Sequence, residues 1–443
     1  MKRYPAYQKT ELPWLKEVPV TWQLIRNKQF LTERKEFVGK DASKYPLLSL
    51  TKQGVILRDV SSGKGKFPKE FDSYKVVEPS NAIFCLFDMD ETPRTIGISK
   101  YRGMITGAYD VFELSNINSR FFYYYYASLD DKKDLKPLYT GLRKTIGVET
   151  FLHAKMPVPS KEEQQQIVLY LDTKTAQIDC AIRGYERLVA LLEERKTAVI
   201  NEAVTKGVRR GIVTKESGVN WLDKIPQHWE MRYAKQLFAL RRDKAREDDE
   251  QLTSSQKYGI ISQQEFMERE GRRVTVVLKG EDILKHVEAG DFVISMRSFQ
   301  GGLEYSHVSG KISSAYVMLI PNHDLVYDRY FRWLFKSESY IRALQGTSDL
   351  IRDGQALRYA NFAKVYLPCI PLNEQKEIAD YIDMEVRRID NAMIPIAKQM
   401  ELLRERRTRL ISDVVTGQVD VCDVVVPDRE AQDDGDEYDG AGA

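Results

Sequence analysis

The sequence predicts two globular domains of mixed α/β (α+β) class, joined by two long antiparallel coiled-coil helices and related by an internal pseudo-two-fold repeat. Three observations lead to this fold class. The chain has 443 residues, which is too long for one ordinary domain. Its motifs occur twice in the same order, and each copy ends in a segment with an apolar residue at every seventh position.

The repeat begins with a Trp-Leu-x-x-x-Pro-x-x-Trp motif, found at residues 14–22 and again at residues 221–229. Near the end of each copy, Glu163-Gln164 recurs as Glu374-Gln375, followed in both cases by Ile, Tyr and Asp at matched spacing. Between these motifs, residues 52–55 match 257–260, and residues 103–109 match 310–316. Because the order of the motifs is kept, we expect both copies to share one fold.

Each copy divides into a globular part and a helical part. Short β-type runs such as residues 82–87 and 292–295 alternate with helical stretches in the globular part. A proline-bearing link at residues 156–160 or 367–371 then precedes a segment rich in Glu, Gln, Arg and Leu, which predicts one long helix. The expected boundaries are globular domains at 1–155 and 208–367, helices at 156–207 and 368–418, and an acidic, disordered tail at 419–443.

The apolar seam of the two helices has a period of seven, which predicts a left-handed coiled coil. The simplest partner of each helix is the helix of the other copy, arranged antiparallel. We expect the second core row to contain few apolar residues. The position three residues beyond the seam is occupied by Lys174, Arg195, Glu385 and Arg406. The seam consists of Leu171, Ile178, Tyr185, Leu192 and Val199 in the first helix and Ile382, Ile389, Ile396, Leu403 and Leu410 in the second.

Composition excludes several classes of function. The four cysteines and five histidines show no zinc-ligand spacing, so no metal site is expected. No apolar run predicts a membrane span or a signal peptide, which makes the cytoplasm the expected compartment. The net charge is +2, but residues 428–443 hold seven acids and one arginine, so the rest of the chain carries +8. A basic body permits a nucleic-acid partner without requiring one.

The sequence contains no catalytic motif that we can identify. There is no G-x-x-x-x-G-K-[ST] phosphate loop and no G-x-G-x-x-G after a strand. The Asn-Pro-Pro-aromatic and Asp-Pro-Pro-aromatic motifs, with which amino-methyltransferases hold a flipped base, are also missing. We therefore expect no catalytic residues in this chain.

The globular domains instead carry loops suited to reading DNA bases. After residues 82–87 the first copy has Asp88, Asp90, Glu91 and Arg94, whereas the second copy has residues 297–302 at the matched place. Arg can bind guanine, Gln can bind adenine and acids can accept from cytosine, while lysines suit phosphates. An alternative role as surface ion pairs or solvated side chains remains open for each. The candidate DNA-binding residues are Lys52, Arg94, Arg143, Lys144, Lys257, Arg297, Ser298, Gln300, Arg352 and Arg358.

The order of domain, Pro-x-x-Glu-Gln helix, domain and helix resembles the specificity subunit of Type I restriction-modification systems. The residues that carry the resemblance are 157–167 and 370–378, with the helix endings at 202–207 and 414–417. The Trp-x-x-x-x-Pro-x-x-Trp motifs also look like the start of this family's target recognition domains.

The resemblance implies a non-catalytic subunit that binds double-stranded DNA. Each domain would read one half of a bipartite asymmetric site, and the paired helices would set the spacer and dock two methyltransferase subunits. Restriction subunits would join outside. No cofactor would be bound by this chain, because S-adenosylmethionine, ATP and Mg belong to the partner subunits.

Two other classes of protein remain possible. A coiled-coil scaffold without sequence-specific DNA binding would explain the helices, but it would not need two elaborate domains with different loops. A single-chain restriction and methylation enzyme would need methyltransferase motifs, which we do not find.

Overall fold

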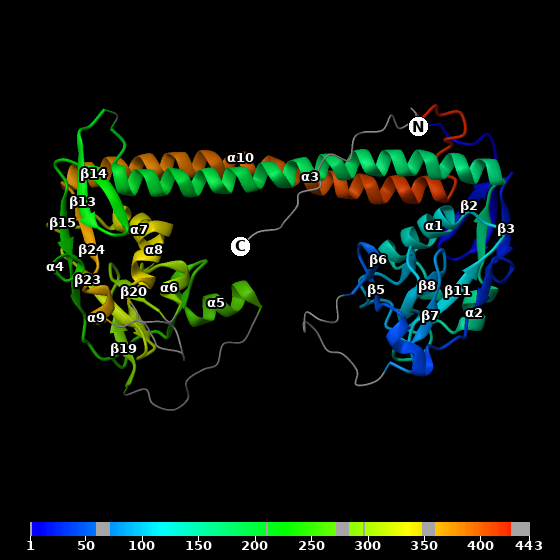
Figure 1. Cartoon of the computed structure of the whole chain (residues 1–443), viewed down its shortest axis with the longest axis horizontal. Coiled ribbons are helices and arrows are strands. Elements are labelled where there is room, and N and C mark those ends of the chain that lie inside the picture. The colour runs from blue at the N-terminus through cyan, green and yellow to red at the C-terminus, as the bar shows by residue number, and fades with distance from the viewer. Residues whose placement is uncertain are drawn as a thin grey trace. The chain divides into compact units, whose positions relative to one another are not determined.

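The computed structural model describes residues 2–58, 71–209, 211–271, 283–295, 297–347 and 359–426 (Figure 1). The chain forms two compact units, Met1–Tyr185 with Lys398–Ala443 and Glu186–Ala397. Each unit combines one globular domain with parts of two long helices, α3 (Lys161–Lys206) and α10 (Leu372–Val415).

The first globular domain is built on a four-stranded antiparallel sheet with the order β4-β11-β8-β9. Strands β1 and β2, β3 and β12, β5 and β6, and β7 and β10 form separate antiparallel pairs. The elements are β1 (Tyr7–Leu12), β2 (Leu15–Pro19), β3 (Gln23–Arg26), β4 (Leu31–Glu33), β5 (Leu48–Thr51), β6 (Gly54–Leu57), β7 (Lys75–Val77), β8 (Ala82–Phe84), β9 (Ile96–Ile98), β10 (Gly103–Ile105), β11 (Asp110–Leu114), α1 (Ser119–Lys132), α2 (Val148–His153) and β12 (Lys155–Val158).

The second globular domain repeats this topology strand for strand. Its four-stranded sheet has the order β16-β23-β20-β21, and the separate pairs again match those of the first copy. The elements are β13 (Thr214–Val219), β14 (Leu222–Pro226), β15 (Glu230–Tyr233), α4 (Ala234–Leu237), β16 (Phe238–Leu240), β17 (Leu252–Ser255), β18 (Gly259–Ser262), α5 (Gln263–Glu270), β19 (Lys285–Val287), β20 (Phe292–Ile294), α6 (Ser298–Gly301), β21 (Glu304–Tyr305), β22 (Gly310–Ile312), β23 (Val317–Pro321), α7 (Asp328–Lys336), α8 (Glu338–Gln345), α9 (Tyr359–Phe362) and β24 (Tyr366–Cys369).

Strands β8 and β20, which lie inside the two four-stranded sheets, are buried on both faces. In β8, Phe84 belongs to the core beneath α1, whereas its neighbour Ile83 belongs to a second cluster on the opposite face. In β20, Phe292 and Val293 divide between two clusters in the same way. Successive side chains of a strand point to opposite faces, so a sheet covered on both sides reads as a continuous apolar run. This explains the runs at 82–87 and 292–295.

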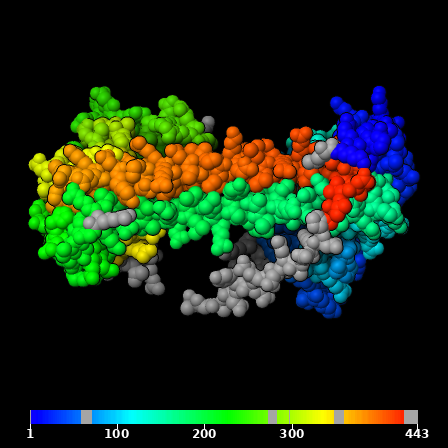
Figure 2. Space-filling model, turned by 90° about the horizontal axis from the view of Figure 1, so that it is seen from above, coloured from blue at the N-terminus to red at the C-terminus, as the bar shows by residue number. Residues whose placement is uncertain are grey.

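Helices α3 and α10 run antiparallel and lie side by side (Figures 1 and 2). In the first unit, Asp179 of α3 pairs with Arg407 of α10 at 2.9 Å. In the second unit, Lys196 of α3 pairs with Asp390 of α10 at 2.7 Å. Moving forward along α3 therefore moves backward along α10, as in the predicted antiparallel coiled coil.

The helical seam differs from the sequence interpretation in its second row. Five of the predicted seam residues are buried, and the other five are partly buried. The second row, however, lies four residues beyond the seam rather than three, and it includes the buried Thr175, Ile182, Ala203, Val386 and Val414. Core spacing in a heptad alternates between three and four, and one seam does not show which step comes first. The second row therefore contains more apolar side chains than expected. Glu385, three residues beyond the seam, is buried as well.

A hydrogen bond from a buried tryptophan joins each globular domain to the start of a long helix. Trp22 Nε1 donates to Glu163 Oε1 at 2.9 Å, and Trp229 Nε1 donates to Glu374 Oε1 at 3.0 Å. Both indoles are buried. The tryptophan motif and the Glu-Gln motif, far apart in each copy, thus form one structure, which we call the joint.

The neighbouring glutamine fixes the first turn of a domain helix in each joint. Gln164 Oε1 accepts from the backbone N of Asn118, which is the N-cap of α1, at 2.9 Å. Gln375 Oε1 accepts from the backbone N of Tyr327, the N-cap of α7, at 2.7 Å. These bonds show that α1 and α7 occupy equivalent positions and that Asn118 corresponds to Tyr327.

An Arg–Asp pair continues the attachment along the long helix. Arg120 of α1 pairs with Asp172, and Arg329 of α7 pairs with Asp383. The same carboxylates also accept from an aromatic donor, which is the Tyr124 hydroxyl in the first copy and the Trp333 indole in the second. The aspartate that ends the Glu-Gln motif is therefore a structural residue in both copies.

A glycine at the end of the other long helix completes each joint. Gly417 follows α10 and lies against Pro19 and Trp22, whereas Gly207 follows α3 and lies against Trp229. Their φ angles of 72° and 77° are in the left-handed region, where a side chain is disfavoured. The helix endings noted in the sequence are thus caps that fit under the tryptophan.

The first eight residues of the expected tail belong to the folded first unit. Val421 is buried in the core, the backbone N of Asp420 donates to Lys2 O, and Gln166 donates to Val424 O. The expectation of a tail beginning at 419 is therefore corrected, because apolar contacts and hydrogen bonds hold residues 419–426. Residues 427–443 lie outside the described residues.

We predict that Gly417→Ala lowers the free energy of unfolding by about 2 to 4 kcal/mol, because the new methyl group collides with the Pro19 ring at a left-handed position. The matched variant Gly184→Ala, at an open helical site, should instead raise it by about 0.5 to 1 kcal/mol. Urea denaturation of both variants measures the difference. Equal stabilities would contradict the proposed role of Gly417.

Candidate nucleic-acid interface

Two loops of the first domain meet at one surface. The loop after β8 contains Asp88 and Asp90, and a turn closed by backbone hydrogen bonds between Thr140 and Thr145 presents Arg143 and Lys144. Arg143 pairs with Asp88 at 2.7 Å, and Lys144 pairs with Asp90 at 2.8 Å. Hydrogen bonds from these cations lower the pKa of both carboxyl groups, which therefore remain ionised acceptors. The structure thus brings together the predicted acidic loop and two predicted cations.

Arg94 does not lie on this surface, contrary to its predicted position. Its side chain is 14% exposed and pairs with Asp130 at 3.2 Å and with Asp131 at 2.8 Å. Asp130 is itself buried and also accepts from Thr95. A guanidinium held by two carboxylates is not available to a base, so Arg94 is a structural residue. The alternative role considered for Arg94, an ion pair, is the one that the structure shows.

The matched loop of the second domain contains three predicted residues, of which one is buried and two are exposed. Ser298 is fully buried, and its Oγ accepts from the backbone N of Ser295 at 2.8 Å, so it shapes the turn and cannot reach DNA. Arg297 and Gln300, by contrast, are exposed at the two ends of this short turn. Neither side chain has a charged partner within the described ranges. Arg297 and Gln300 therefore keep the geometry of candidate base readers.

The two matched lysines occupy equivalent hairpin turns. Lys52 lies between β5 and β6 and is exposed. Lys257 lies between β17 and β18, where it pairs with Glu270 at 3.4 Å and covers the ring of Tyr258. Both positions suit contact with a phosphate. The remaining candidates, Arg352 and Arg358, lie outside the described residues.

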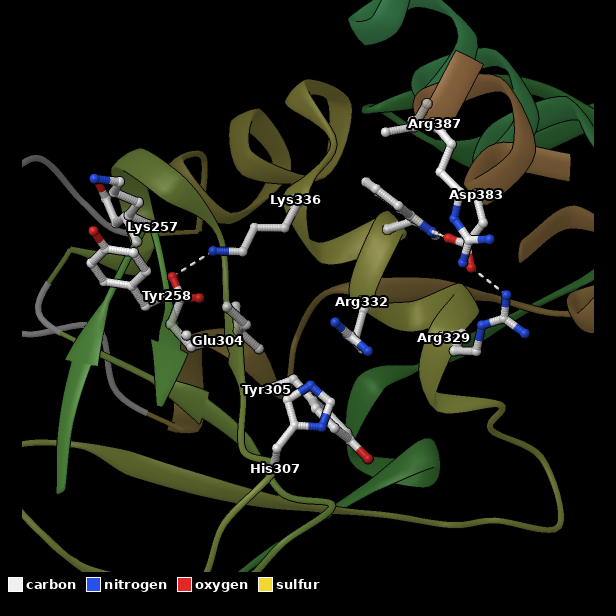
Figure 3. Close-up of a pocket in the computed structure, with 15 residues that line it drawn as sticks. Lys257, Tyr258, Glu304, Tyr305, His307, Arg329, Arg332, Lys336, Asp383 and Arg387 are labelled. Carbon is white, nitrogen blue, oxygen red and sulfur yellow. Dashed lines mark hydrogen bonds and ion pairs between the residues drawn. The ribbon is translucent and has the colours of Figure 1, made fainter. Parts of the chain in front are cut away.

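Sequence reasoning missed a cleft of about 800 Å³ in the second unit (Figure 3). The cleft lies between the β17–β18 hairpin, the segment after β21, helix α7 and the beginning of α10. Five basic side chains and two carboxylates line it, which gives a net charge of +3 before any contribution from His307. Its charged residues are Lys257, Arg329, Arg332, Lys336, Arg387, Glu304 and Asp383.

The charges in the cleft fall into two groups. Glu304 pairs with Lys336, and Asp383 pairs with Arg329, as the dashed lines in Figure 3 show. Arg332 lies over the ring of Tyr305, and both Arg332 and Arg387 are exposed. The sequence did contain a signal for this site, because Arg332 replaces Tyr123 and Arg387 replaces Ala176 between the matched copies.

The described residues give no sign of a metal centre or a membrane span. We find among them no group of three or more His, Cys, Asp or Glu side chains that could hold a metal ion. No helix in this part of the chain is both long and apolar enough to cross a bilayer.

Comparison with protein families identifies the chain. The family model of the Type I restriction modification DNA specificity domain matches twice, at residues 21–182 and 226–394. These matches cover more than half of the sequence and coincide with the two structural copies. The chain therefore belongs to the Type I restriction-modification DNA specificity family. Its role is DNA specificity, and it is not a catalytic subunit. Comparison with curated proteins gives no match.

Two solved structures resemble this chain, and the first of them supports the same fold. A structure from a study of complex assembly and conformational transition of the type I R-M system matches with a TM-score of 0.63 at 13% identity. The match covers 91% of this chain and 99% of that chain. The HsdS subunit from Thermoanaerobacter tengcongensis matches with a TM-score of 0.49 at 14% identity, covering 91% of this chain and 98% of that one.

We predict that Arg94→Ala reduces stability rather than changing the recognised sequence. Breaking a largely buried ion pair should cost on the order of 3 kcal/mol, because Asp130 loses a charged partner. Arg143→Ala, which breaks an exposed pair, should leave the free energy of unfolding close to that of the wild type. Chemical denaturation measures both. A stable Arg94→Ala protein with an altered DNA sequence preference would show that Arg94 contacts DNA.

Proposed function

We propose that this chain reads a bipartite asymmetric DNA sequence, with one globular domain for each half. The observation that carries the proposal is that the two domains share strand order and joint but differ in their exposed loops. A common framework with different loops suits two different half-sites on one duplex.

The chemistry of the loops supports different base preferences. In the first domain, Asp88 and Asp90 are acceptors held beside Arg143 and Lys144, so the surface combines carboxylates with phosphate-binding cations. In the second domain, Arg297 and Gln300 supply donors, of which Arg suits guanine and Gln suits adenine. The duplicated lysines, Lys52 and Lys257, would contact the backbone at both half-sites.

The paired helices are proposed to set the spacer. Each joint fixes a domain to the ends of α3 and α10 through the tryptophan–glutamate hydrogen bond and the terminal glycine. Since α3 is continuous from Lys161 to Lys206, its length at about 1.5 Å per residue would contribute to the distance between half-sites.

The same helices are proposed to dock two methyltransferase subunits. Leu191 of α3 and Leu402 of α10 occupy equivalent positions in the repeat, and they are 54% and 48% exposed. Large stretches of both helices are open to solvent in Figure 2. In the first unit, Leu402 lines a groove of about 610 Å³ together with Leu410 and Val419. Two equivalent apolar positions suit two copies of one partner.

The reaction chemistry is then assigned to the partners. The methyltransferase subunits would bind S-adenosylmethionine, and restriction subunits would use ATP and Mg. This chain would bring them to the chosen DNA sequence in the cytoplasm.

We predict that replacing residues 219–367 with the matching domain of a family member changes one half-site and leaves the other unchanged. The first domain keeps its own joint and loops in such a chimaera. Methylome sequencing after co-expression with the methyltransferase subunits reads both half-sites. The reciprocal replacement of residues 1–155 should change the opposite half. Alteration of both half-sites by a single replacement would contradict the assignment of one domain per half.

We predict that Leu191→Asp and Leu402→Asp each remove one bound methyltransferase subunit and that the double variant removes both. A charge at a half-exposed apolar contact disfavours docking without disturbing the cores, which contain neither leucine. Native mass spectrometry gives the stoichiometry. Val425→Asp, at an exposed apolar residue outside the helices, is the control. Binding of two subunits to the double variant at wild-type affinity would exclude this docking surface.

A further inference from the structure

The basic cleft of the second unit contains cations that the fold itself does not use. Arg329 and Lys336 have carboxylate partners, Asp383 and Glu304, and these pairs attach α7 to α10 and to β21. Arg332 and Arg387 have no ion-pair partner among the described residues. Two uncompensated guanidinium groups beside one cleft repel each other, so a bound anion would relieve an electrostatic cost.

The first copy shows that these two arginines are dispensable for folding. The structural pair Arg329–Asp383 has an equivalent in Arg120–Asp172, at the same place in the joint. Aligned on this pair, Arg332 corresponds to Tyr123 and Arg387 to Ala176. The same framework therefore forms without either charge, so the fold does not require the two cations at the cleft.

The chemistry of the cleft favours a phosphate. Arg332 is held over the Tyr305 ring at 5.1 Å, and His307 packs against the same ring at 4.8 Å between centroids. Figure 3 shows Arg332 and Lys336 reaching toward the cleft from α7, with His307 beneath and Arg387 on α10. Planar guanidinium groups bind phosphate oxygens through paired N–H donors. The two carboxylates are already neutralised by their own partners, so they do not oppose an anion.

The position of the cleft favours DNA backbone over a free nucleotide. Gln256, which lines the cleft, donates to the backbone O of Arg297 at 3.4 Å. The candidate base-reading turn therefore adjoins the cleft, as a phosphate contact next to a base contact requires. Lys257, a candidate phosphate contact from the repeat, lies on the same hairpin as Gln256. Arg332 and Arg387 are also exposed, which suits a continuous polyanion passing the rim.

We propose that this cleft binds backbone phosphate of the DNA at the second half-site, with Arg332 and Arg387 as its ligands. The inference rests on the proposed function, and it adds an asymmetry. The second domain would hold its half-site with phosphate contacts that have no counterpart at the matched positions of the first domain.

The test uses the assembled methyltransferase complex and the double variant Arg332→Ala/Arg387→Ala. Dissociation constants are measured over a range of salt concentrations for a cognate duplex and for a duplex with both half-sites scrambled. Each lost phosphate contact should reduce the slope of log K against log salt by about 1, so the double variant should lose about 2 on both duplexes. The cognate-to-scrambled ratio should stay unchanged, because phosphates carry no sequence information.

Two variants serve as controls. Arg332→Lys/Arg387→Lys keeps the charge and should restore most of the slope. Arg342→Ala removes another exposed arginine, from α8 of the same domain, where it pairs with Glu338, and should leave the slope unchanged. Thermal melting of all variants verifies folding.

Several outcomes would overturn the inference. An unchanged slope for the double variant, or a loss equal to that of Arg342→Ala, would remove the cleft from the DNA interface. A loss confined to the cognate duplex would make the arginines base readers. Binding of ATP or inorganic phosphate to the DNA-free complex that the double variant abolishes, with the DNA slope intact, would make the cleft a small-anion site. A wild-type complex that binds both duplexes equally would contradict the proposed function. The slope of log K against log salt would still show whether the cleft contacts phosphate.

Discussion

The hydrogen bond between a buried tryptophan indole and the glutamate at the start of a long helix organises each half of this protein. A buried carboxylate without donors would carry a large desolvation cost, so Glu374 is stable only where Trp229 and His228 meet it. The first copy satisfies Glu163 through Trp22 and Tyr4. The glutamate therefore fixes where the helix begins relative to the domain. The glutamine, the Arg–Asp pair and the terminal glycine then attach to that fixed point.

Because the chain contains two copies of one framework, matched residues of the copies can be compared directly. Residues that occur in both joints, such as Trp22 and Trp229, are explained by folding alone. Residues that differ on the same framework, such as Arg332 against Tyr123, are not required by that framework. The exposed loops after β8 and β20 and the arginines beside the cleft are differences of this kind.

Burial and ion pairing together decide which arginines are available to DNA. Arg94 and Arg329 are both held by carboxylates, and removing either from its partner would leave a charge uncompensated. Arg297, Arg332 and Arg387 are exposed and lack such partners within the described ranges. In the second domain, the proposed recognition surface therefore depends on which arginines carboxylates leave unpaired. In the first domain, Arg143 and Lys144 are paired with Asp88 and Asp90 but remain exposed.

The amino-acid sequence alone predicts the duplication, the mixed domains and the two long helices, because repeated motifs and a period of seven are properties of order along the chain. It also placed Lys52 and Lys257 in equivalent turns. It could not determine the second helical row, since the seam alone does not distinguish a step of three from a step of four. Nor could it show that Arg94 is held by carboxylates, that Ser298 is buried, or that Arg332 and Arg387 share a cleft. Those outcomes depend on partners distant in sequence, such as Asp130 for Arg94 and the start of α10 for α7. Tertiary packing decided them, because burial and ion pairing depend on distance in space.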